Sequence, residues 1–392
     1  MSVPPPPPPG RSAAPTVAYG PGAVHRVPAI AERSGARRVL LVCGRTSFEA
    51  SGAAEMLPAL ERVAAVRRWS GFRPNTDSAD LAVGLDVVRE HRPDLVVAVG
   101  GGSTLDMAKL LVGYHDVAPE EVVTAIRSGR GATSRSARLL LAPTTSGSGA
   151  EATHFAVVYV GDDKHSIAGP AMRADAIVLD PSLTLSGSHY QRATSGIDAV
   201  AQAIESLWAT CATERSRRFA RHAVRLLLPA IRRFVDDADG TAARGMAIGS
   251  HLAGRAIDVS RTTAAHALSY GLTKGYGVSH GHAVAVTLGA FIEWHGRPEG
   301  MESLQPTVDP GTHADAMRTI VRMLGASDPA GARARFERLV RDLGLDVGLA
   351  AVGAGTPADR ERLVAGVNVE RLGNNPVRFG PDELEELLRS VT

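Results

Sequence analysis

The stretch 94–112, DLVVAVGGGSTLDMAKLLV, joins a short apolar run to a helical pattern through three glycines and a serine. Residues 94–99 predict a strand buried on both faces, because such a strand is apolar throughout rather than alternating. In the turn that follows, glycines let the backbone approach a phosphate, and the next helix presents free N–H groups at its N-terminus. The stretch therefore indicates a parallel α/β sheet with a nucleotide site at the end of this strand.

A second turn of the same kind supports this interpretation. Residues 139–142 are another apolar run, and the segment PTTSGSG follows it with hydroxyl donors at Thr144, Thr145 and Ser148. Ligands of open parallel sheets bind outside the carboxyl ends of the strands, so two such turns favour a nucleotide site over ordinary strand-to-helix turns. Neither turn has the Gly-Lys-Ser/Thr ending of a P-loop, which disfavours phosphoryl transfer.

The order of the remaining patterns divides the chain in two. Strand and helix patterns alternate up to about residue 185, and helical patterns alone follow, which predicts an α/β domain and then an all-α domain. We therefore predict a disordered proline-rich tail over residues 1–15, a Rossmann-like dinucleotide domain over residues 16–185 and a helical domain over residues 186–392. Further strands are predicted at 38–42, 63–69, 155–160, 164–167 and 176–179, and helices of the second domain at 193–209, 215–236, 241–257, 314–324, 330–343, 357–366 and 381–391.

Composition and charge exclude several classes of protein. The net charge of +2 offers no electrostatic argument for binding nucleic acid or a membrane surface. There is no apolar run long enough to span a bilayer and no charged-then-apolar signal at the N-terminus. Cys43 and Cys211 are too few for a disulfide framework. A soluble cytoplasmic protein without nucleic-acid or membrane partners is expected.

Residues 261–282, RTTAAHALSYGLTKGYGVSHGH, contain a pair of histidines that suggests a metal site. His266 and His280 lie 14 positions apart, which on one straight helix would be roughly 21 Å. If both bind one ion, the chain must fold back between them, and Gly271, Gly275 and Gly277 are the residues that allow it. The alternative is a glycine-rich loop with incidental histidines.

Asp198 and Gln202 add two oxygen ligands to this hypothesis. They are four residues apart in a predicted helix and share one face of it. Such a pair alone is usually a solvated helix face. Combined with His266 and His280, it gives one carboxylate, one amide oxygen and two imidazoles, a set that suits Fe²⁺ or Zn²⁺ and leaves a position open for substrate.

Five ordered motifs resemble those of the iron-containing (group III) alcohol dehydrogenases, over essentially all of residues 19–392. They are GGGSTLDMAK, APTTSGSGAE, Asp180-Pro181, the Gly-x-Asp-Ala at the start of the predicted metal helix, and the histidine pair. The resemblance implies an N-terminal Rossmann-like domain and an all-α metal-binding domain, the dehydroquinate synthase-like architecture, with the active site in the cleft between them. It implies enzymatic activity and a homodimer.

The resemblance also assigns roles to residues of this sequence. It implies that the first glycine turn holds the cofactor pyrophosphate, that the second lines the nicotinamide, and that one lysine reaches the ribose. The residues are Gly101, Gly102 and Ser103 with Asp106 nearby, then Thr144, Thr145 and Ser148, and then Lys164. Asp198, His266 and His280 match three of four metal ligands.

Two departures from the family pattern concern the metal site. The family usually has histidine where Gln202 stands, and an amide is a weaker donor than imidazole, so a lower affinity, a changed metal preference or loss of the metal follows. The family often has a proton-relay histidine where Tyr270 stands. The tyrosine hydroxyl either replaces it as proton donor or fills space.

The position after the first strand concerns the choice of cofactor. Members that prefer NAD tend to carry an aspartate there, which bonds the ribose 2′-OH and repels a 2′-phosphate. Here Gly44 and Arg45 occupy this place, so the repulsion is absent and a cation is available. We therefore expect NADP(H) to be preferred, with NAD(H) use retained.

A narrower resemblance, carried by TTAAHALSYGLTK and IESLW, is to phosphonoacetaldehyde reductases of phosphonate natural-product pathways. It implies reduction of phosphonoacetaldehyde to 2-hydroxyethylphosphonate, and a dianionic substrate needs cations near the metal. Arg261 and Lys274 are the predicted cations, unless they serve salt bridges. Thr262, Thr263 and His282 are further predicted substrate ligands, and Tyr270 and Lys274 are the predicted catalytic residues.

Three alternatives stay open from sequence. One is a general alcohol dehydrogenase for small alcohols or diols. Another is a dehydroquinate synthase-like cyclase, which a chain with only three lysines, Lys109, Lys164 and Lys274, suits poorly. The third is a metal-free nucleotide-binding relic. The expected partner in the favoured case is a small, anionic aldehyde, with Fe²⁺ preferred over Zn²⁺.

Overall fold

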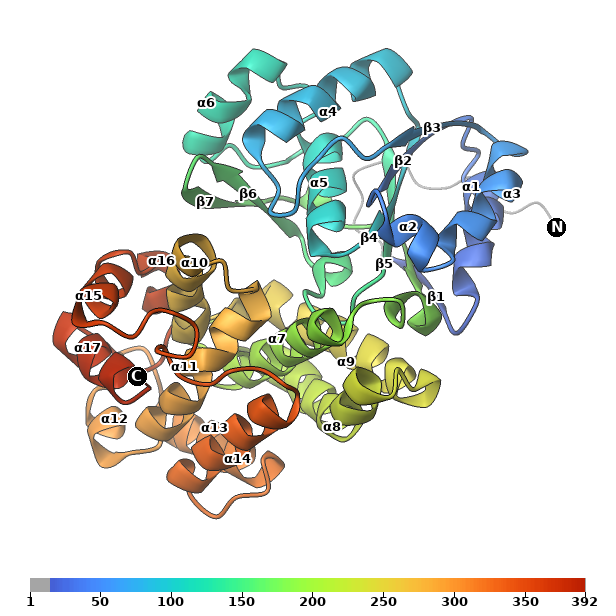
Figure 1. Cartoon of the computed structure of the whole chain (residues 1–392). Helices are drawn as coiled ribbons and strands as arrows, with labels where there is room; N and C mark the ends of the chain where they lie inside the picture. The colour runs from blue at the N-terminus through green and yellow to red at the C-terminus, as the bar shows by residue number, and fades with distance from the viewer. Residues whose placement is uncertain (1–14, 392) are drawn as a thin grey trace. The chain divides into compact units, whose positions relative to one another are not determined.

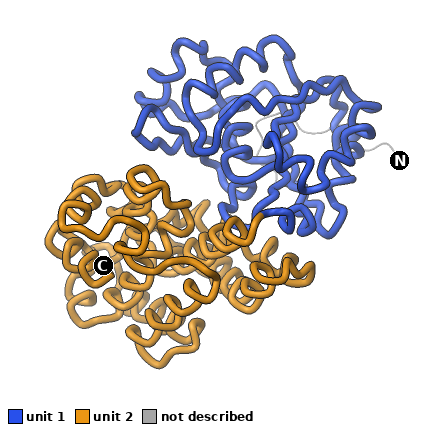
Figure 2. Tube along the Cα trace, viewed as in Figure 1, with its two compact units in different colours: residues 1–187 blue, residues 188–392 orange. Residues whose placement is uncertain are grey.

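A computed structural model describes residues 15–391 of the chain. Its contacts divide it into two compact units, residues 1–187 and residues 188–392, coloured separately in Figure 2. The division falls two residues beyond the predicted boundary at residue 185. The predicted tail lies, apart from Pro15, outside the described residues.

The first unit is built on a six-stranded sheet in which every pair of neighbouring strands is parallel. The strand order is β1-β8-β5-β4-β2-β3, so β4 and β5, the strands before the two glycine turns, are neighbours. The strands are β1 (Thr16–Tyr19), β2 (Arg38–Cys43), β3 (Ala65–Trp69), β4 (Leu95–Gly100), β5 (Arg138–Pro143) and β8 (Ala176–Leu179).

Helices cover both faces of this sheet (Figure 1). One face packs against α4 (Ser78–His91), α5 (Gly102–Gly113) and α6 (Val122–Arg127). The other packs against α1 (Val27–Arg33), α2 (Ser47–Ala50) and α3 (Leu57–Glu61). Burial on both faces explains why β2, β4 and β5 are apolar throughout rather than alternating.

A separate hairpin pairs β6 (Phe155–Val160) with β7 (Asp163–Ala168), as the sequence predicts. It is attached to α5 by a buried lysine: Nζ of Lys109 donates to Oγ1 of Thr153 at 2.7 Å and to the carbonyl of Phe155 at 2.9 Å. Lys109 therefore has a structural function, tying the glycine-turn helix to the hairpin.

The second unit consists of helices alone among its described residues, which confirms the predicted α/β plus all-α fold. At its centre is α7 (His189–Trp208), whose start is fixed by a capping box between Ser188 and Gln191 and whose second half is fully buried. The others are α8 (Glu214–Asp236), α9 (Gly240–Ser260), α10 (Ala264–Tyr276), α11 (His280–His295), α12 (Pro298–Glu302), α13 (Pro310–Met323), α14 (Pro329–Asp342), α15 (Pro357–Ala365), α16 (Val369–Gly373) and α17 (Pro381–Arg389).

The segment around the two histidines differs from the predicted glycine-rich fold-back. It forms two helices, α10 and α11, which pack against each other. Gly271 and Gly275 lie inside α10, and only Gly277 makes the turn, with a φ of +68° after the last residue of the helix. Gly271 serves packing instead, because a Cβ there would lie 2.7 Å from Cδ2 of Leu363 on α15.

Within the described residues, none of the helices combines the length and the apolar character needed to cross a bilayer.

Candidate metal centre and nucleotide site

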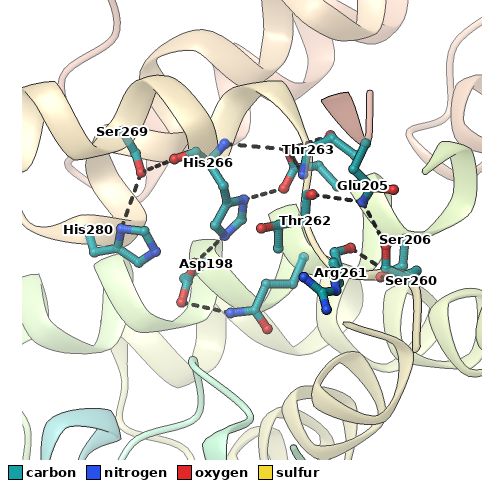
Figure 3. A network of polar contacts seen from close by, with 12 residues as sticks. Asp198, Glu205, Ser206, Ser260, Arg261, Thr262, Thr263, His266, Ser269 and His280 are labelled. Carbon is teal, nitrogen blue, oxygen red and sulfur yellow. Dashed lines mark hydrogen bonds and ion pairs between the residues drawn. The ribbon is translucent and has the colours of Figure 1, made fainter. Parts of the chain in front are cut away.

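The four predicted metal ligands come from three helices of the second unit. Asp198 and Gln202 lie one turn apart on α7, His266 lies in the first turn of α10, and His280 is the first residue of α11. Asp198, His266 and His280 each offer a ligand atom, and these three atoms all lie within 4.8 Å of one another. Figure 3 shows their side chains converging from the three helices.

A glycine explains how α11 comes so close to α7. A Cβ on Gly281 would lie 2.0 Å from the carbonyl oxygen of Thr194 and 2.7 Å from Cβ of Asp198. Any side chain at this position would therefore push the start of α11, and His280 with it, away from α7. The glycine between the two histidines of the sequence HGH is thus a requirement of packing.

Glu205 is a part of the site that the sequence analysis missed. Its side chain is fully buried, and one oxygen accepts hydrogen bonds from Oγ1 of Thr263 at 2.8 Å and from the Thr263 backbone N–H at 3.3 Å. Its other oxygen faces Nδ1 of His266. A carboxylate acceptor at Nδ1 selects the tautomer with a free lone pair on Nε2, the atom turned toward Asp198.

One feature of the sequence could have indicated this role. Glu205 follows Asp198 by seven residues and Gln202 by three, so all three residues lie on the same face of α7. A carboxylate at such a position is usually solvated. The end of α7 is buried, however, and a fully buried carboxylate such as that of Glu205 needs partners.

His280 is held in the same way as His266. Oγ of Ser269 donates to the backbone carbonyl of His266 at 2.8 Å and lies 3.3 Å from Nδ1 of His280. With its hydrogen used on that carbonyl, the hydroxyl accepts from Nδ1–H of His280, and this tautomer carries its lone pair on Nε2, as a metal ligand requires. The two histidines are therefore oriented by protein groups before any ion binds.

The electrostatics of the cluster favour a cation. Burial of His266 by itself lowers the imidazole pKa, but the charge of Glu205 and the hydrogen bonds and charge from Asp198 outweigh it and raise the pKa to about 10. The ring thus carries a positive charge between two carboxylates. A divalent cation at Nε2 would supply that charge in place of the proton.

Gln202 completes the set of donors. Its Nε2 donates to Oδ2 of Asp198 at 3.0 Å, and its Oε1 is buried and accepts no hydrogen bond from the described residues. A half-turn of the amide exchanges the two atoms and turns the oxygen toward Asp198. Two imidazoles, a carboxylate and an amide oxygen, all buried or nearly so, fit a divalent transition metal.

Tyr270 lies beside this cluster, where the sequence predicts a proton donor. It is half-buried on α10, and its ring stacks on that of His280, with the ring centroids 6.3 Å apart and the planes inclined by 26°. The phenol is therefore a neighbour of a predicted metal ligand.

The predicted substrate ligands just before α10 are largely engaged by the protein. The guanidinium of Arg261 pairs with Glu370 on α16. Oγ1 of Thr263 donates to Glu205 and accepts from Nε1 of Trp208 at 3.0 Å. The backbone carbonyl of Thr262 accepts from Nδ2 of Asn374 at 2.9 Å. These contacts give Arg261 and Thr263 structural partners and argue against them as free substrate ligands.

His282 and Lys274 are less suited to substrate binding than the sequence suggests. Nδ1 of His282 lies 3.3 Å from the hydroxyl of Tyr190, and its Nε2 lies 2.8 Å from the carbonyl oxygen of Asp346. Both ring nitrogens therefore face protein groups. Lys274 is exposed and stands eight residues beyond His266 on α10, about 12 Å further along the helix axis, which is far for a two-carbon substrate held at the cluster.

In the first unit the two glycine turns lie against each other. A Cβ on Gly102 would lie 2.9 Å from Oγ of Ser148, and one on Gly101 would lie 3.5 Å from Cγ2 of Thr145. Oγ of Ser103 accepts from the Asn75 N–H at 3.1 Å. The turns after β4 and β5 thus form one continuous surface at the carboxyl end of the sheet, beside the N-terminus of α5.

Asp106 contacts the hairpin of β6 and β7, and Lys164 is part of it. One carboxylate oxygen of Asp106 accepts from the Val157 N–H at 3.0 Å, and the other lies 3.9 Å from Nζ of Lys109. Burial raises the pKa of Asp106, and the charge of Lys109 opposes the rise. The Asp106 side chain therefore joins α5 to the hairpin instead of the pyrophosphate turn. Lys164 is on β7 with its ammonium 6.0 Å from the centre of the Tyr159 ring.

The turn after β2 carries the predicted determinants of cofactor choice. A Cβ on Gly44 would lie 2.1 Å from Oγ of Ser47, so a side chain at this position would require the Ser47 hydroxyl to move. Arg45 is exposed, and its Nε donates to the carbonyl of Ser70 at 3.2 Å, next to the end of β3. A cation therefore stands at the end of the second strand.

Comparison with known families finds a match for each of the two units. Residues 14–181 match the family model described as iron-containing alcohol dehydrogenase, and residues 192–392 match the C-terminal model of the same family. The chain belongs to the iron-containing alcohol dehydrogenases. It is an enzyme of that family, whose members act on alcohols and aldehydes.

Individual relatives show which members of the family this chain resembles. The chain is 35% identical to phosphonoacetaldehyde reductase of Streptomyces viridochromogenes, over 77% of each chain. It is 34% identical to long-chain-alcohol dehydrogenase 1 of Geobacillus thermodenitrificans, over 55% of this chain and 54% of the relative. The fold resembles that of a sulfoacetaldehyde reductase from Bifidobacterium kashiwanohense solved with NAD⁺, with a TM-score of 0.87, 24% identity and 97% of each chain covered.

Proposed function

We propose that this enzyme is a metal-dependent, NAD(P)H-linked reductase that converts phosphonoacetaldehyde to 2-hydroxyethylphosphonate. The convergence of Asp198, His266 and His280 carries the proposal, because it supplies a site for a Lewis-acid cation. The likeness to a phosphonoacetaldehyde reductase over most of both chains supports the choice of substrate. The reaction class is that of the family. The particular substrate is what we propose for this chain.

The residues of the chain have distinct functions in this proposal. A bound divalent cation, Fe²⁺ or Zn²⁺, supplies polarisation of the aldehyde carbonyl, and the nicotinamide supplies the hydride. Asp198, Gln202, His266 and His280 would hold the cation. Glu205 and Ser269 contact Nδ1 of the two histidines, so that Nε2 of each ring is the nitrogen that would bind the cation.

Tyr270 is the proposed source of the proton for the product alcohol. Its ring packs on His280 beside the cluster, and a phenol can both donate and accept a proton. Thr263 is less suited to this function, since its hydroxyl donates to Glu205. The proton reaches the developing alkoxide directly or through water.

For the cofactor we propose that NADP(H) is preferred and NAD(H) is accepted. The glycine turns after β4 and β5 would hold the pyrophosphate beside the N-terminus of α5. Gly44 and Arg45 offer no carboxylate to repel a 2′-phosphate and one cation to bind it. We also propose that the enzyme is a homodimer, which light scattering of the purified protein would measure.

A general alcohol dehydrogenase is the second candidate, and the likeness to a long-chain-alcohol dehydrogenase favours it. The two candidates differ in the substrate charge that they require. A general enzyme would reduce neutral aldehydes as well as phosphonoacetaldehyde. The specific enzyme would prefer the dianion by a large factor.

The test is NADPH oxidation by the purified full chain, reconstituted with Fe²⁺ or with Zn²⁺, on a panel of aldehydes. We expect kcat/KM for phosphonoacetaldehyde to exceed that for acetaldehyde and propionaldehyde by at least about 100-fold, the value of two charge-assisted contacts. Equal rates across the panel would support the general enzyme. Turnover that is insensitive to chelation would contradict metal dependence.

A further inference from the structure

Arg371 on α16 is a buried cation without a partner in the described chain. Among the lysines and arginines of residues 15–391, three are at least nine-tenths buried: Lys109 is 0% exposed, Arg360 9% and Arg371 7%. Lys109 donates to Thr153 and Phe155, and Arg360 pairs with Glu385. Across residues 15–391, by contrast, the guanidinium of Arg371 makes neither an ion pair nor a hydrogen bond.

This state is unusual for a guanidinium. Removing a charge from water without pairing it is costly, and buried charges in proteins are therefore paired or hydrogen-bonded. An arginine cannot escape the cost by losing its proton, because its pKa is too high. No carboxylate of residues 15–391 pairs with Arg371, so its guanidinium is open to an anion from solution, the natural partner of this group.

Arg371 lies on α16, which packs against α10, the helix that carries His266. Asn374 is three residues further on, both residues are buried, and so both face inward from the end of α16. Nδ2 of Asn374 donates to the carbonyls of Ser260 and Thr262 at 2.7 and 2.9 Å. That segment leads directly into α10, whose first turn carries His266.

This arrangement distinguishes Arg371 from Arg261, the cation that the sequence favours. Arg261 is 44% exposed at its side chain, and its charge is matched by Glu370. A substrate anion would have to displace that carboxylate. Arg371 comes next to Glu370 in the chain, but its side chain is largely buried and no carboxylate of the described residues pairs with its guanidinium.

We propose that Arg371 binds the tetrahedral oxyanion of the substrate, through paired N–H donors to two of its oxygens. The planar fork of a guanidinium matches two oxygens of a phosphonate, and burial strengthens the contact. Arg371 would thereby select aldehydes that carry an anionic group on the adjacent carbon. The inference rests on the proposed function, since it names the residue that recognises the charge of that substrate.

Arg371→Gln, which removes the charge and keeps much of the side chain, tests the proposal in the metal-loaded full chain. We expect kcat/KM for phosphonoacetaldehyde to fall about 10- to 100-fold, as for loss of one charge-assisted contact. The value for propionaldehyde, which is neutral, should stay within about threefold. Arg335→Gln is the matched control, because it removes an exposed arginine of the same unit. An equal fall on both aldehydes would assign Arg371 a structural function and overturn the proposal.

A binding measurement separates this inference from the proposed reaction. Isothermal titration with methylphosphonate, which has no carbonyl to reduce, should show binding to the wild type and about 10- to 100-fold weaker binding to Arg371→Gln. That result would support the anion site even if the wild type reduced phosphonoacetaldehyde no better than propionaldehyde, which would contradict only the proposed function. Equal binding by both proteins would overturn the inference while leaving the reaction intact.

A conservative variant covers the case in which Arg371→Gln does not fold. Arg371→Lys keeps the charge and loses the planar fork. We expect it to bind methylphosphonate about 3- to 10-fold more weakly than the wild type. Its preference for phosphonoacetaldehyde over propionaldehyde should fall by the same factor. Affinity equal to that of the wild type would contradict the proposed contact.

Discussion

Glu205 and Asp198 face opposite nitrogens of the same imidazole: the carboxylate of Glu205 lies at Nδ1 of His266, and Oδ1 of Asp198 lies 3.4 Å from Nε2. Both carboxylates come from α7, seven residues apart, and the ring comes from α10. Glu205 therefore acts on the predicted metal site through His266. It is a positioning residue, and its effect should appear in metal binding.

Replacing Glu205 by glutamine should weaken metal binding. The variant keeps the shape of the side chain but removes the charge that selects the tautomer of His266. We expect affinity for Zn²⁺ or Fe²⁺ to fall about 10- to 100-fold, the usual effect of losing such a partner, measured by competition with a chelator. Glu299→Gln, on the exposed side of α12, is the control. Unchanged affinity in a folded Glu205→Gln protein would contradict the positioning function.

Replacing Gln202 by histidine should have the opposite effect. An imidazole is a stronger donor to Fe²⁺ and Zn²⁺ than an amide oxygen. It would also remove the hydrogen bond from the Gln202 amide to Asp198. We expect metal affinity to rise on the order of tenfold, again by chelator competition. If metal affinity falls or stays the same, residue 202 is not a ligand position.

Gly281→Ala tests whether close packing of α11 on α7 builds the cluster. The added Cβ would meet the Thr194 carbonyl at 2.0 Å, so the start of α11 must move. We expect the free energy of unfolding to fall by about 1–3 kcal/mol and the bound metal per chain to fall with it.

Gly275→Ala is the matched control for this change. Gly275 lies inside α10 with nothing within 4 Å of an added Cβ. Alanine in a helix is favoured over glycine by about 1 kcal/mol, so this variant should be slightly more stable and bind metal normally. Chemical denaturation measures both, and a similar loss in the two variants would refute the packing argument.

Arg45→Ala tests the choice of cofactor. Arg45 is exposed at the end of β2 and is held by the Ser70 carbonyl. Removing a charge-assisted contact to a 2′-phosphate should raise KM for NADPH about tenfold or more and leave KM for NADH nearly unchanged. Arg62→Ala removes an exposed arginine elsewhere in the same unit and should change neither. Parallel changes for both cofactors would exclude a 2′-phosphate contact.

The sequence predicts the fold well because its signals are local. The apolar runs at β4 and β5 and the glycines after them follow from burial on both faces of the sheet. Reliance on local signals also explains why the helices α10 and α11 were not predicted. Local glycine content argued against helices, whereas Gly271 and Gly281 are there for contacts with Leu363 and Thr194, which only the tertiary structure shows.

Some residues of the candidate site could be predicted from local sequence patterns, and others could not. Asp198, Gln202 and the two histidines have spacings that suggest ligands, and the structure brings three of them together. Glu205 and Arg371 depend on burial, which the sequence does not reveal: one carboxylate in a helix and one arginine among many carry no pattern of their own. The misplaced substrate ligands, such as His282, were chosen by proximity in sequence, and their hydrogen bonds lead elsewhere.

Stability should fall in mild acid because of two histidines far from the metal cluster in sequence. Burial, with a contribution from His313, holds the pKa of His295 well below its usual value, and burial also lowers the pKa of His313. Nε2 of His295 accepts from Nδ2 of Asn375 at 3.0 Å, and Nε2 of His313 faces the His295 carbonyl at 3.0 Å. Burial therefore favours the neutral form of both rings in the folded chain.

The sign of the effect follows from proton binding. Below about pH 6.5 the unfolded chain protonates both histidines, whereas the folded chain does not, so the unfolded state binds more protons and stability falls as the pH is lowered. Each histidine contributes a slope of up to about 1.4 kcal/mol per pH unit. Denaturant unfolding between pH 5 and 8 measures it. His313→Gln should flatten the profile, whereas His222→Gln, at an exposed position on α8, should leave it unchanged. A wild-type profile that is flat below pH 6.5 would show that neither histidine is held neutral.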